Sequence, residues 1–214
     1  MIKRKNNFKI RNYNKKHISE NKFYKFIKKI KKETDILTMD DIIHKSNIRS
    51  HNKKKKCIIT FDDGFENNYS VVSPILDNLK VPAIFYLSTD FVENNSMSWI
   101  DKIEYSIENT SENFLKLPWL KDRVPIKKTD DKIHLLENLR KKIKKDINFN
   151  IDKFTSYIFN ECKIKEINSL NTEIDKKLNW TQVKKLNNNN LFTIGGHSHE
   201  HKSFTTMSYP TFKK

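Results

Sequence analysis

The sequence predicts an α/β fold with parallel strands, because strand-like and helix-like segments alternate along the chain. The first strand is expected at Cys57–Phe61, an apolar and β-branched run that is too short for a helix. Helix-spaced apolar residues follow over 67–79, although Pro74 interrupts them, and a second buried strand is expected at Val81–Leu87. This order is typical of a βα unit whose parallel strands are covered on both faces.

The same alternation resumes near the carboxyl end. Helix-spaced apolar residues begin at Trp180, and either Asn179 or Thr181 can cap that helix. The asparagine run at 187–190 is expected to end the helix, and Leu191–Ile194 is expected to form a third strand. The stretch between the two regions is polar and lysine-rich with several helical patterns, so it is predicted to be a helical insertion rather than a second domain.

The first part of the chain is basic. Residues 1 to about 20 are polar and are expected to be poorly ordered. Phe23, Phe26, Ile27 and Ile30 then recur at helical spacing with lysines on the other face. This apolar stripe can pack on the protein's own core, which we favour, or make a peripheral contact with a membrane. Thr38 is expected to cap a short helix after it.

Together these elements predict a single, incomplete domain with four segments. They are a lead-in with the amphipathic helix at 1–52, the first βαβ unit at 53–95, the helical insertion at 96–178, and the third strand with its following turn at 179–214.

Lysine and arginine number 42 against 26 aspartates and glutamates, which gives a formal net charge of +16. A net positive charge of this size is typical of proteins that bind nucleic acid, an anionic membrane or an acidic substrate. The lysines are mixed with asparagine and isoleucine along the whole chain, as A/T-rich coding would produce, so we favour compositional drift. No RNP, helix-turn-helix or zinc-finger pattern occurs, and no nucleic-acid partner is expected.

The two cysteines, Cys57 and Cys162, belong to no CxxC or Cys/His cluster, which favours a reduced compartment. The basic amino terminus has no apolar signal-peptide core, and no run reaches the ~18–20 apolar residues of a membrane span. The sequence therefore predicts a soluble, cytoplasmic protein.

Two chemically distinctive sequences follow predicted strands. Asp62 and Asp63 come directly after the first strand, and adjacent carboxylates resist burial unless an arginine, a lysine or a metal joins them. His197 and His201 follow the third strand and share one side if their segment forms a helical turn. Carboxyl ends of parallel strands meet at one edge, and two imidazoles with one carboxylate can bind a catalytic divalent metal. A solvated turn and surface histidines are the alternative reading.

These residues resemble a known family. Thr60-Phe61-Asp62-Asp63-Gly64 and His197-Ser198-x-x-His201 are similar to the first two motifs of the polysaccharide deacetylases, the NodB-homology group or carbohydrate esterase family four. The similarity extends over 26–43, 62–89 and 179–204. Ser98-Trp99-Ile100-Asp101 and the helices after it are similar to members that carry an insertion.

The resemblance implies a role for each site residue. Asp63, His197 and His201 would bind a divalent metal, most often Zn²⁺, and Asp62 would be the catalytic base. The implied reaction is hydrolysis of an N-acetyl group on a sugar or polysaccharide precursor, and the implied fold is a partial NodB-type distorted (β/α) barrel. The resemblance leaves the oligomeric state open.

Neighbouring residues are expected to support these ligands. Ser198 would orient the histidine loop by hydrogen bonds, Gly64 would permit the turn after Asp63, and Gly195 with Gly196 would permit a close backbone approach. His199 and Glu200 are expected to face solvent, with His199 as a stand-in ligand.

The family's later motifs are absent, including the histidine that protonates the leaving amine, and three strands cannot close the family's barrel. We therefore expect an unclosed barrel and an activity impaired by truncation. Two alternatives stay open. The chain could be a non-catalytic module that binds carbohydrate or a protein partner, or a basic protein that binds nucleic acid or a membrane surface.

Overall fold

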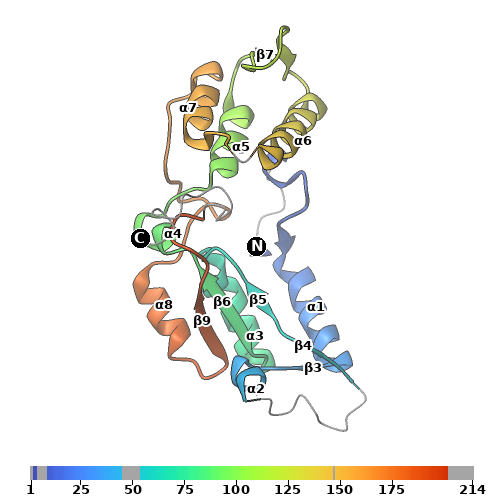
Figure 1. Cartoon of the computed structure of the whole chain (residues 1–214). Coiled ribbons are helices and arrows are strands. Elements are labelled where there is room, and N and C mark those ends of the chain that lie inside the picture. The colour runs from blue at the N-terminus through green and yellow to red at the C-terminus, as the bar shows by residue number, and fades with distance from the viewer. Residues whose placement is uncertain (1, 4–8, 45–53, 147, 202–214) are drawn as a thin grey trace. The chain divides into compact units, whose positions relative to one another are not determined.

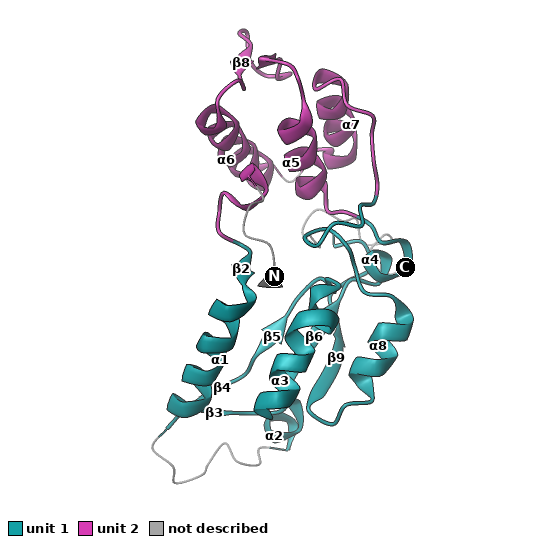
Figure 2. Cartoon of the chain, turned by 180° about the vertical axis from the view of Figure 1, so that it is seen from behind, with its two compact units in different colours: residues 1–6, 16–96, 169–201 teal, residues 7–15, 97–168, 202–214 magenta. Residues whose placement is uncertain are grey.

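The computed structural model describes residues 2–3, 9–44, 54–146 and 148–201 (Figure 1). Residues 45–53, at the end of the predicted lead-in, and residues 202–214, which include the end of the similarity over 179–204, lie outside the described residues. The chain forms two compact units, coloured separately in Figure 2. Unit 1 contains described residues of the ranges 1–6, 16–96 and 169–201, and unit 2 contains described residues of the ranges 7–15 and 97–168.

Unit 1 is built on a three-stranded parallel sheet in the order β5-β6-β9. The strands are β5 (Thr60–Phe61), β6 (Ala83–Leu87) and β9 (Phe192–Gly196). Phe85 of β6 is in register with Phe61 on one side and with Ile194 on the other. The predicted α/β fold with parallel strands is confirmed, and the described strands do not close a barrel.

The first predicted strand is divided into two short strands. β4 (Lys55–Cys57) pairs in parallel with β3 (Thr34–Ile36), whereas β5 pairs with β6. The expectation that this run is fully buried is wrong, because Ile58 is 42% exposed. β5 is the edge strand of its sheet, and only the alternate side chains Ile59 and Phe61 pack against the core.

The helices of unit 1 are α1 (Glu20–Glu33), α2 (Met39–Ile43), α3 (Ser73–Leu79), α4 (Thr89–Asn94) and α8 (Trp180–Asn187), and the short parallel pair β1 (Ile2–Lys3) and β2 (Ile18–Ser19) precedes α1. Buried residues of α1, α3 and α8 belong to the core that the strands share. The side chains of Thr38 and Asn179 cap α2 and α8, in agreement with the sequence. Pro74 does not break the 67–79 segment: a π-helical turn, η2 (Asn68–Val72), comes first, so Pro74 lies in the first turn of α3.

The core of unit 1 contains a row of aromatic rings that crosses the sheet. The Phe85 ring stacks on Phe61 with centroids 5.2 Å apart and meets the Phe192 ring edge-on at 5.3 Å. Phe23 of α1 packs edge-on against Phe61 at 5.9 Å. In Figure 2, α3 and α8 lie over one face of the sheet. Their buried residues Leu76 and Leu186 belong to the same core as the strand residues, so both helices pack against the strands.

Unit 2 is mainly helical, with α5 (Trp99–Asn109), α6 (Thr129–Lys145) and α7 (Ile151–Glu161). Between α5 and α6 the chain forms a short antiparallel hairpin of β7 (Phe114–Leu115) and β8 (Val124–Pro125). The unit has its own apolar core, whose completely buried members include Ile103, Ile107, Leu115, Ile126, Leu136 and Ile158.

The expectation of a poorly ordered amino terminus is wrong for the described residues from 9 onward. The short helix η1 (Lys9–Asn12) belongs to unit 2, where Ile10 is buried in the core. Arg11 is also buried, and its Nε lies 3.7 Å from the buried carboxylate of Glu104. Arg140 Nη2 donates to the same carboxylate at 2.8 Å. The segment is fixed because its isoleucine and its arginine both have buried partners.

The amphipathic helix α1 packs on the core of unit 1 through Phe23 and Ile27. Phe26, which the periodicity placed on the same stripe, is 55% exposed, so that part of the prediction is wrong. The buried stripe of α1 consists of Phe23 and Ile27, which are four residues apart, and the Phe26 ring lies outside it. None of the described helices is long and apolar enough to cross a membrane.

This difference gives a matched pair of variants. Phe23→Ala should lower the free energy of unfolding by about 3–5 kcal/mol, because it opens a cavity in the core. Phe26→Ala should change it by less than about 1 kcal/mol, since the ring is exposed. Urea unfolding followed by circular dichroism measures both, and equal losses would contradict the placement of α1.

Candidate metal centre

The predicted site residues lie at the carboxyl edge of the parallel sheet, but on strands that are not neighbours. Asp62 and Asp63 follow β5, and His197 follows β9, with β6 between them. Two strand spacings separate β5 from β9 by about 9.6 Å, so side chains that follow both strands can reach one ion only across the end of β6. The turns that carry these side chains must therefore be directed toward that end.

The turn after β5 crosses the end of β6. Asp63 and Gly64 have φ of 73° and 79°, so two successive residues adopt the left-handed conformation. A Cβ on Gly64 would lie 3.2 Å from Leu87 Cδ2 and 3.4 Å from Val92 Cγ2. Gly64 is required both for its conformation and for its contact with the end of β6, as the sequence predicts.

A distant segment holds this turn from its other side. The backbone N–H of Leu178 donates to the Gly64 carbonyl at 2.9 Å, and the N–H of Glu66 donates to the Lys176 carbonyl at 2.9 Å. Between them, Phe65 and Lys177 form an antiparallel bridge. Residues at 176–178, within the predicted insertion, therefore belong to the support of the Asp63 turn.

The end of β6 also holds the histidine loop. The N–H of His197 donates to the Leu87 carbonyl at 2.8 Å, and Ser88 Oγ donates to the His197 carbonyl at 2.9 Å. The Thr89 N–H donates to the Ser198 carbonyl at 3.3 Å. These contacts fix the direction in which the loop leaves β9.

The two histidines do not share a helical turn, so that condition of the prediction is wrong. Ser198 and His201 have φ of 66° and 55°, and the loop bends sharply between the two rings. Ser198 Oγ accepts a hydrogen bond from the His201 N–H at 3.1 Å, which closes the bend. The ring centroids of His197 and His201 are 5.2 Å apart, so the bend brings the imidazoles together without a helix.

Asp63, His197 and His201 converge. Asp63 Oδ1 lies 3.1 Å from His201 Nε2 and 3.6 Å from His197 Nε2, and candidate ligand atoms of the three residues all lie within 4.8 Å of one another. Ligand atoms about 2.1 Å from a tetrahedral Zn²⁺ lie about 3.4 Å apart. Asp63 Oδ1 is buried and has no hydrogen-bond partner in the described structure. A buried carboxylate oxygen without a donor, beside two ring nitrogens, fits a divalent cation.

The electrostatic surroundings keep Asp63 ionised. Burial alone raises the pKa of Asp63, but its contact with His201 and the positive charges of His201, His197 and Lys177 outweigh burial and lower the pKa. The carboxylate is therefore in the charged form that metal binding requires.

The other predicted site residues lie around this group. Asp62 is exposed, and no described residue donates a hydrogen bond to its carboxylate. His199 and Glu200 are exposed, as expected, and His199 Nδ1 shares a hydrogen bond of 2.7 Å with Thr89 Oγ1. The close backbone approach is made by Gly195 rather than Gly196. A Cβ on Gly195 would lie 2.6 Å from Tyr86 Cδ1, whereas a Cβ on Gly196 would meet nothing within 4 Å.

Sequence reasoning missed two residues beside the site. Lys177 is buried, and its Nζ lies 3.7 Å from the centre of the Phe65 ring and 5.0 Å from that of Phe91. Phe91 in turn lies 5.6 Å from the His201 ring. The sequence gives only a weak indication that Lys177 lies in an ordered segment. Two apolar residues, Ile174 and Leu178, flank it in a polar stretch, and both are buried in the structure.

Comparisons with known proteins agree with these motifs. The family model of the polysaccharide deacetylases matches residues 49–214. No curated protein matches the sequence. Similar solved structures are a de-N-acetylase from Aggregatibacter actinomycetemcomitans (16% identity, TM-score 0.43, 85% of this chain and 45% of that one) and the BpsB deacetylase domain from Bordetella bronchiseptica (16%, 0.40, 84% and 43%). A third is the Streptococcus pyogenes deacetylase PplD in complex with acetate (25%, 0.33, 41% and 41%). The chain spans less than half the length of each.

The two glycines at the end of β9 allow a matched test. Gly195→Ala should lower the free energy of unfolding by about 1–3 kcal/mol, because its Cβ overlaps the Tyr86 ring. Gly196→Ala, in open space, should cost less than about 1 kcal/mol. In a Tyr86→Ala background the extra cost of Gly195→Ala should disappear, which denaturant unfolding of the four proteins measures. A cost that persists without the Tyr86 ring would contradict this reading.

Proposed function

From the premise that this chain belongs to the polysaccharide deacetylase family, we propose that it is a divalent-metal-dependent hydrolase that removes N-acetyl groups from a sugar or polysaccharide. The observation that carries the proposal is the convergence of Asp63, His197 and His201 beside the exposed carboxylate of Asp62. The reaction consumes water and converts the acetamide to an amine and acetate.

Each residue has a separate part in this proposal. Asp63, His197 and His201 would hold the cation, with Zn²⁺ favoured by a ligand set of two imidazoles and one carboxylate. The cation supplies positive charge that polarises an acetamide carbonyl and acidifies water. Asp62 is not occupied by a described partner, so its carboxylate can accept the proton of the attacking water. Ser198 keeps His201 in place through the hydrogen bond to the His201 N–H.

The surroundings of the site support an ionised ligand and a fixed loop. The Leu87 carbonyl, the Leu178 N–H and the Ser88 hydroxyl hold both turns through hydrogen bonds that need no ligand. A preorganised set of ligands binds a metal without a large ordering cost.

Metal binding is tested with purified protein, zinc and calorimetric titration. The unchanged chain should bind one Zn²⁺ per molecule. Asp63→Ala and His201→Ala should each weaken binding by more than about 100-fold, because loss of a direct ligand exceeds the ~10–100-fold cost of losing a residue that only orients one. His199→Ala is the matched control and should retain the affinity. Equal binding by Asp63→Ala and His199→Ala would refute the assignment.

The role of Asp62 is tested separately from metal binding. Asp62→Asn should keep the zinc affinity within a few-fold and lower the rate of acetate release from N-acetylglucosamine oligomers by about 10²–10⁴-fold, the usual contribution of a general base. Acetate release is followed with an enzyme-coupled assay in the zinc-loaded protein. A variant that binds zinc and retains full activity would remove Asp62 from the mechanism.

A further inference from the structure

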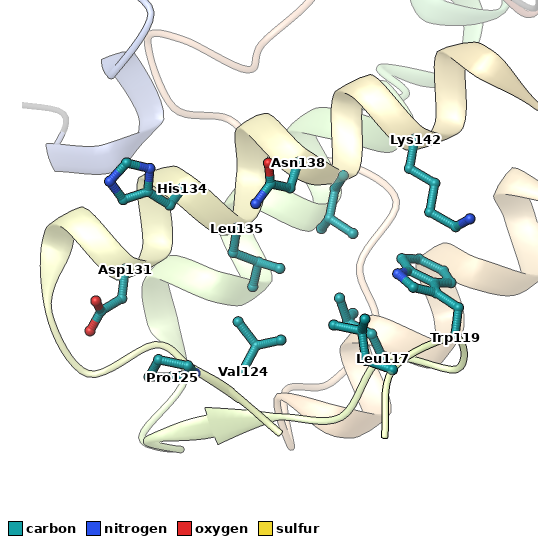
Figure 3. Close-up of a pocket in the computed structure, with 11 residues that line it drawn as sticks. Leu117, Trp119, Val124, Pro125, Asp131, His134, Leu135, Asn138 and Lys142 are labelled. Atoms are coloured by element: carbon teal, nitrogen blue, oxygen red, sulfur yellow. The ribbon is translucent and has the colours of Figure 1, made fainter. Parts of the chain in front are cut away.

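Unit 2 contains a cavity of about 380 Å³ between α6 and the β7–β8 hairpin, far in sequence from the metal ligands. Figure 3 shows Leu135 and Asn138 of α6 pointing toward Val124 and Leu117 of the hairpin region, with Trp119 and Lys142 at one end and Asp131 and His134 at the other. Leu120, Pro125 and Leu139 complete the lining. Pockets that bind small molecules have volumes of about 300–1,000 Å³, so this cavity is at the lower end of that range.

The walls of this cavity are largely apolar. Leu117, Leu135 and Leu139 are buried members of the core of unit 2, so they form a fixed floor beneath the accessible apolar side chains of Leu120 and Val124. Leu120 is 43% exposed. An apolar wall with an open edge suits a ligand that has both an apolar face and a polar rim.

Unused polar groups line the same cavity. The Asn138 amide offers two donors and an acceptor, and the Trp119 indole offers one donor. Neither side chain has a hydrogen-bond partner among the described residues; Asn138 is exposed and Trp119 is partly exposed, so both groups are accessible to a ligand. The Trp119 ring is held by contacts with Phe154, at 5.2 Å, and Phe149, at 5.9 Å, so its N–H has a fixed direction.

The charges at the cavity favour a neutral ligand. Asp131 and Lys142 balance each other at opposite ends. The Lys142 ammonium lies 4.8 Å from the centre of the Trp119 ring, where a cation–π contact holds it. A phosphate or a nucleic acid backbone would need several unopposed cations, which this lining does not offer.

We propose that this cavity is a carbohydrate subsite that binds an N-acetylated sugar residue. The proposal deepens the proposed function, on which it rests for the class of ligand. The C–H face and the acetamide methyl of the sugar would pack against Leu120 and Val124, the accessible apolar side chains of the lining. Its hydroxyl and amide groups would exchange hydrogen bonds with Asn138 and Trp119. Unit 2 would thus contribute polymer binding that needs no metal.

The test uses the full chain in EDTA, titrated with the trisaccharide of β-1,4-linked N-acetylglucosamine and observed by calorimetry and saturation-transfer NMR. The trisaccharide should bind, and its acetamide methyl should show saturation transfer. Asn138→Ala should weaken binding by about fivefold, the effect of losing one hydrogen bond of ~1 kcal/mol. Glu137→Ala is the matched control, because Glu137 is exposed on the same helix but does not line the cavity. Trp119→Phe, which keeps an aromatic ring for packing, should also weaken binding.

The outcomes separate this inference from the proposed function. Binding that is unchanged in Asp63→Ala and weakened in Asn138→Ala supports the subsite, even if the zinc-loaded protein releases no acetate. No binding, or the same affinity in Asn138→Ala and Glu137→Ala, overturns the subsite, even if deacetylation is observed. Equally tight binding of the glucosamine trisaccharide would overturn the assigned role of the acetamide group.

Discussion

The central strand of the sheet is the constraint on which the candidate metal centre depends. β6 separates the strand that carries the aspartates from the strand that leads to the histidines. Side chains that follow strands two places apart can reach one ion only if the turns that carry them are held in the right direction. β6 supports both turns, since Leu87 packs next to Gly64 and accepts a hydrogen bond from His197. The same strand therefore separates the candidate ligands and positions them.

The cost of this arrangement is the burial of a carboxylate oxygen. An isolated buried charge is unfavourable, and Asp63 Oδ1 has no hydrogen-bond donor to compensate it. Without a cation, the contact with His201 and the neighbouring Lys177 contribute to lowering the pKa of Asp63, which keeps its carboxylate ionised. A divalent cation at the same place would satisfy the oxygen directly. The ionised carboxylate is the form in which an aspartate binds a metal.

Much of this site could be predicted from the sequence because its determinants are local. A short apolar run followed by Asp62-Asp63-Gly64, and a second run followed by His197 and His201, place both groups at one sheet edge. The bend between the histidines could not be predicted, because Ser198 adopts its left-handed conformation through contacts with Thr89 and His201. Lys177 was missed for a similar reason, since its contacts with Phe65 and Phe91 join distant parts of the chain.

The fold shows the same limit of local patterns. Periodicity predicts α1 and its buried Phe23, but whether Phe26 is covered depends on what packs beside the helix. The amino-terminal segment looked disordered because it is polar and basic, yet Ile10 and Arg11 are buried by partners about a hundred residues away along the chain, as the Ile10–Glu108 hydrogen bond illustrates. Composition indicates whether a segment would be ordered by itself, whereas contacts with distant residues determine whether it is ordered in the folded protein.

The contrast between Asp62 and Asp63 shows how one turn produces two different carboxylates. Successive side chains of an extended strand point to opposite sides, and the left-handed conformation of Asp63 then redirects the chain over β6. Asp63 consequently meets two imidazoles in a partly buried site, whereas Asp62 is exposed. Acids in different environments can hold different chemical roles, one as a fixed ligand and one as a proton acceptor. The geometry of the turn therefore gives two adjacent aspartates the different surroundings that their proposed roles require.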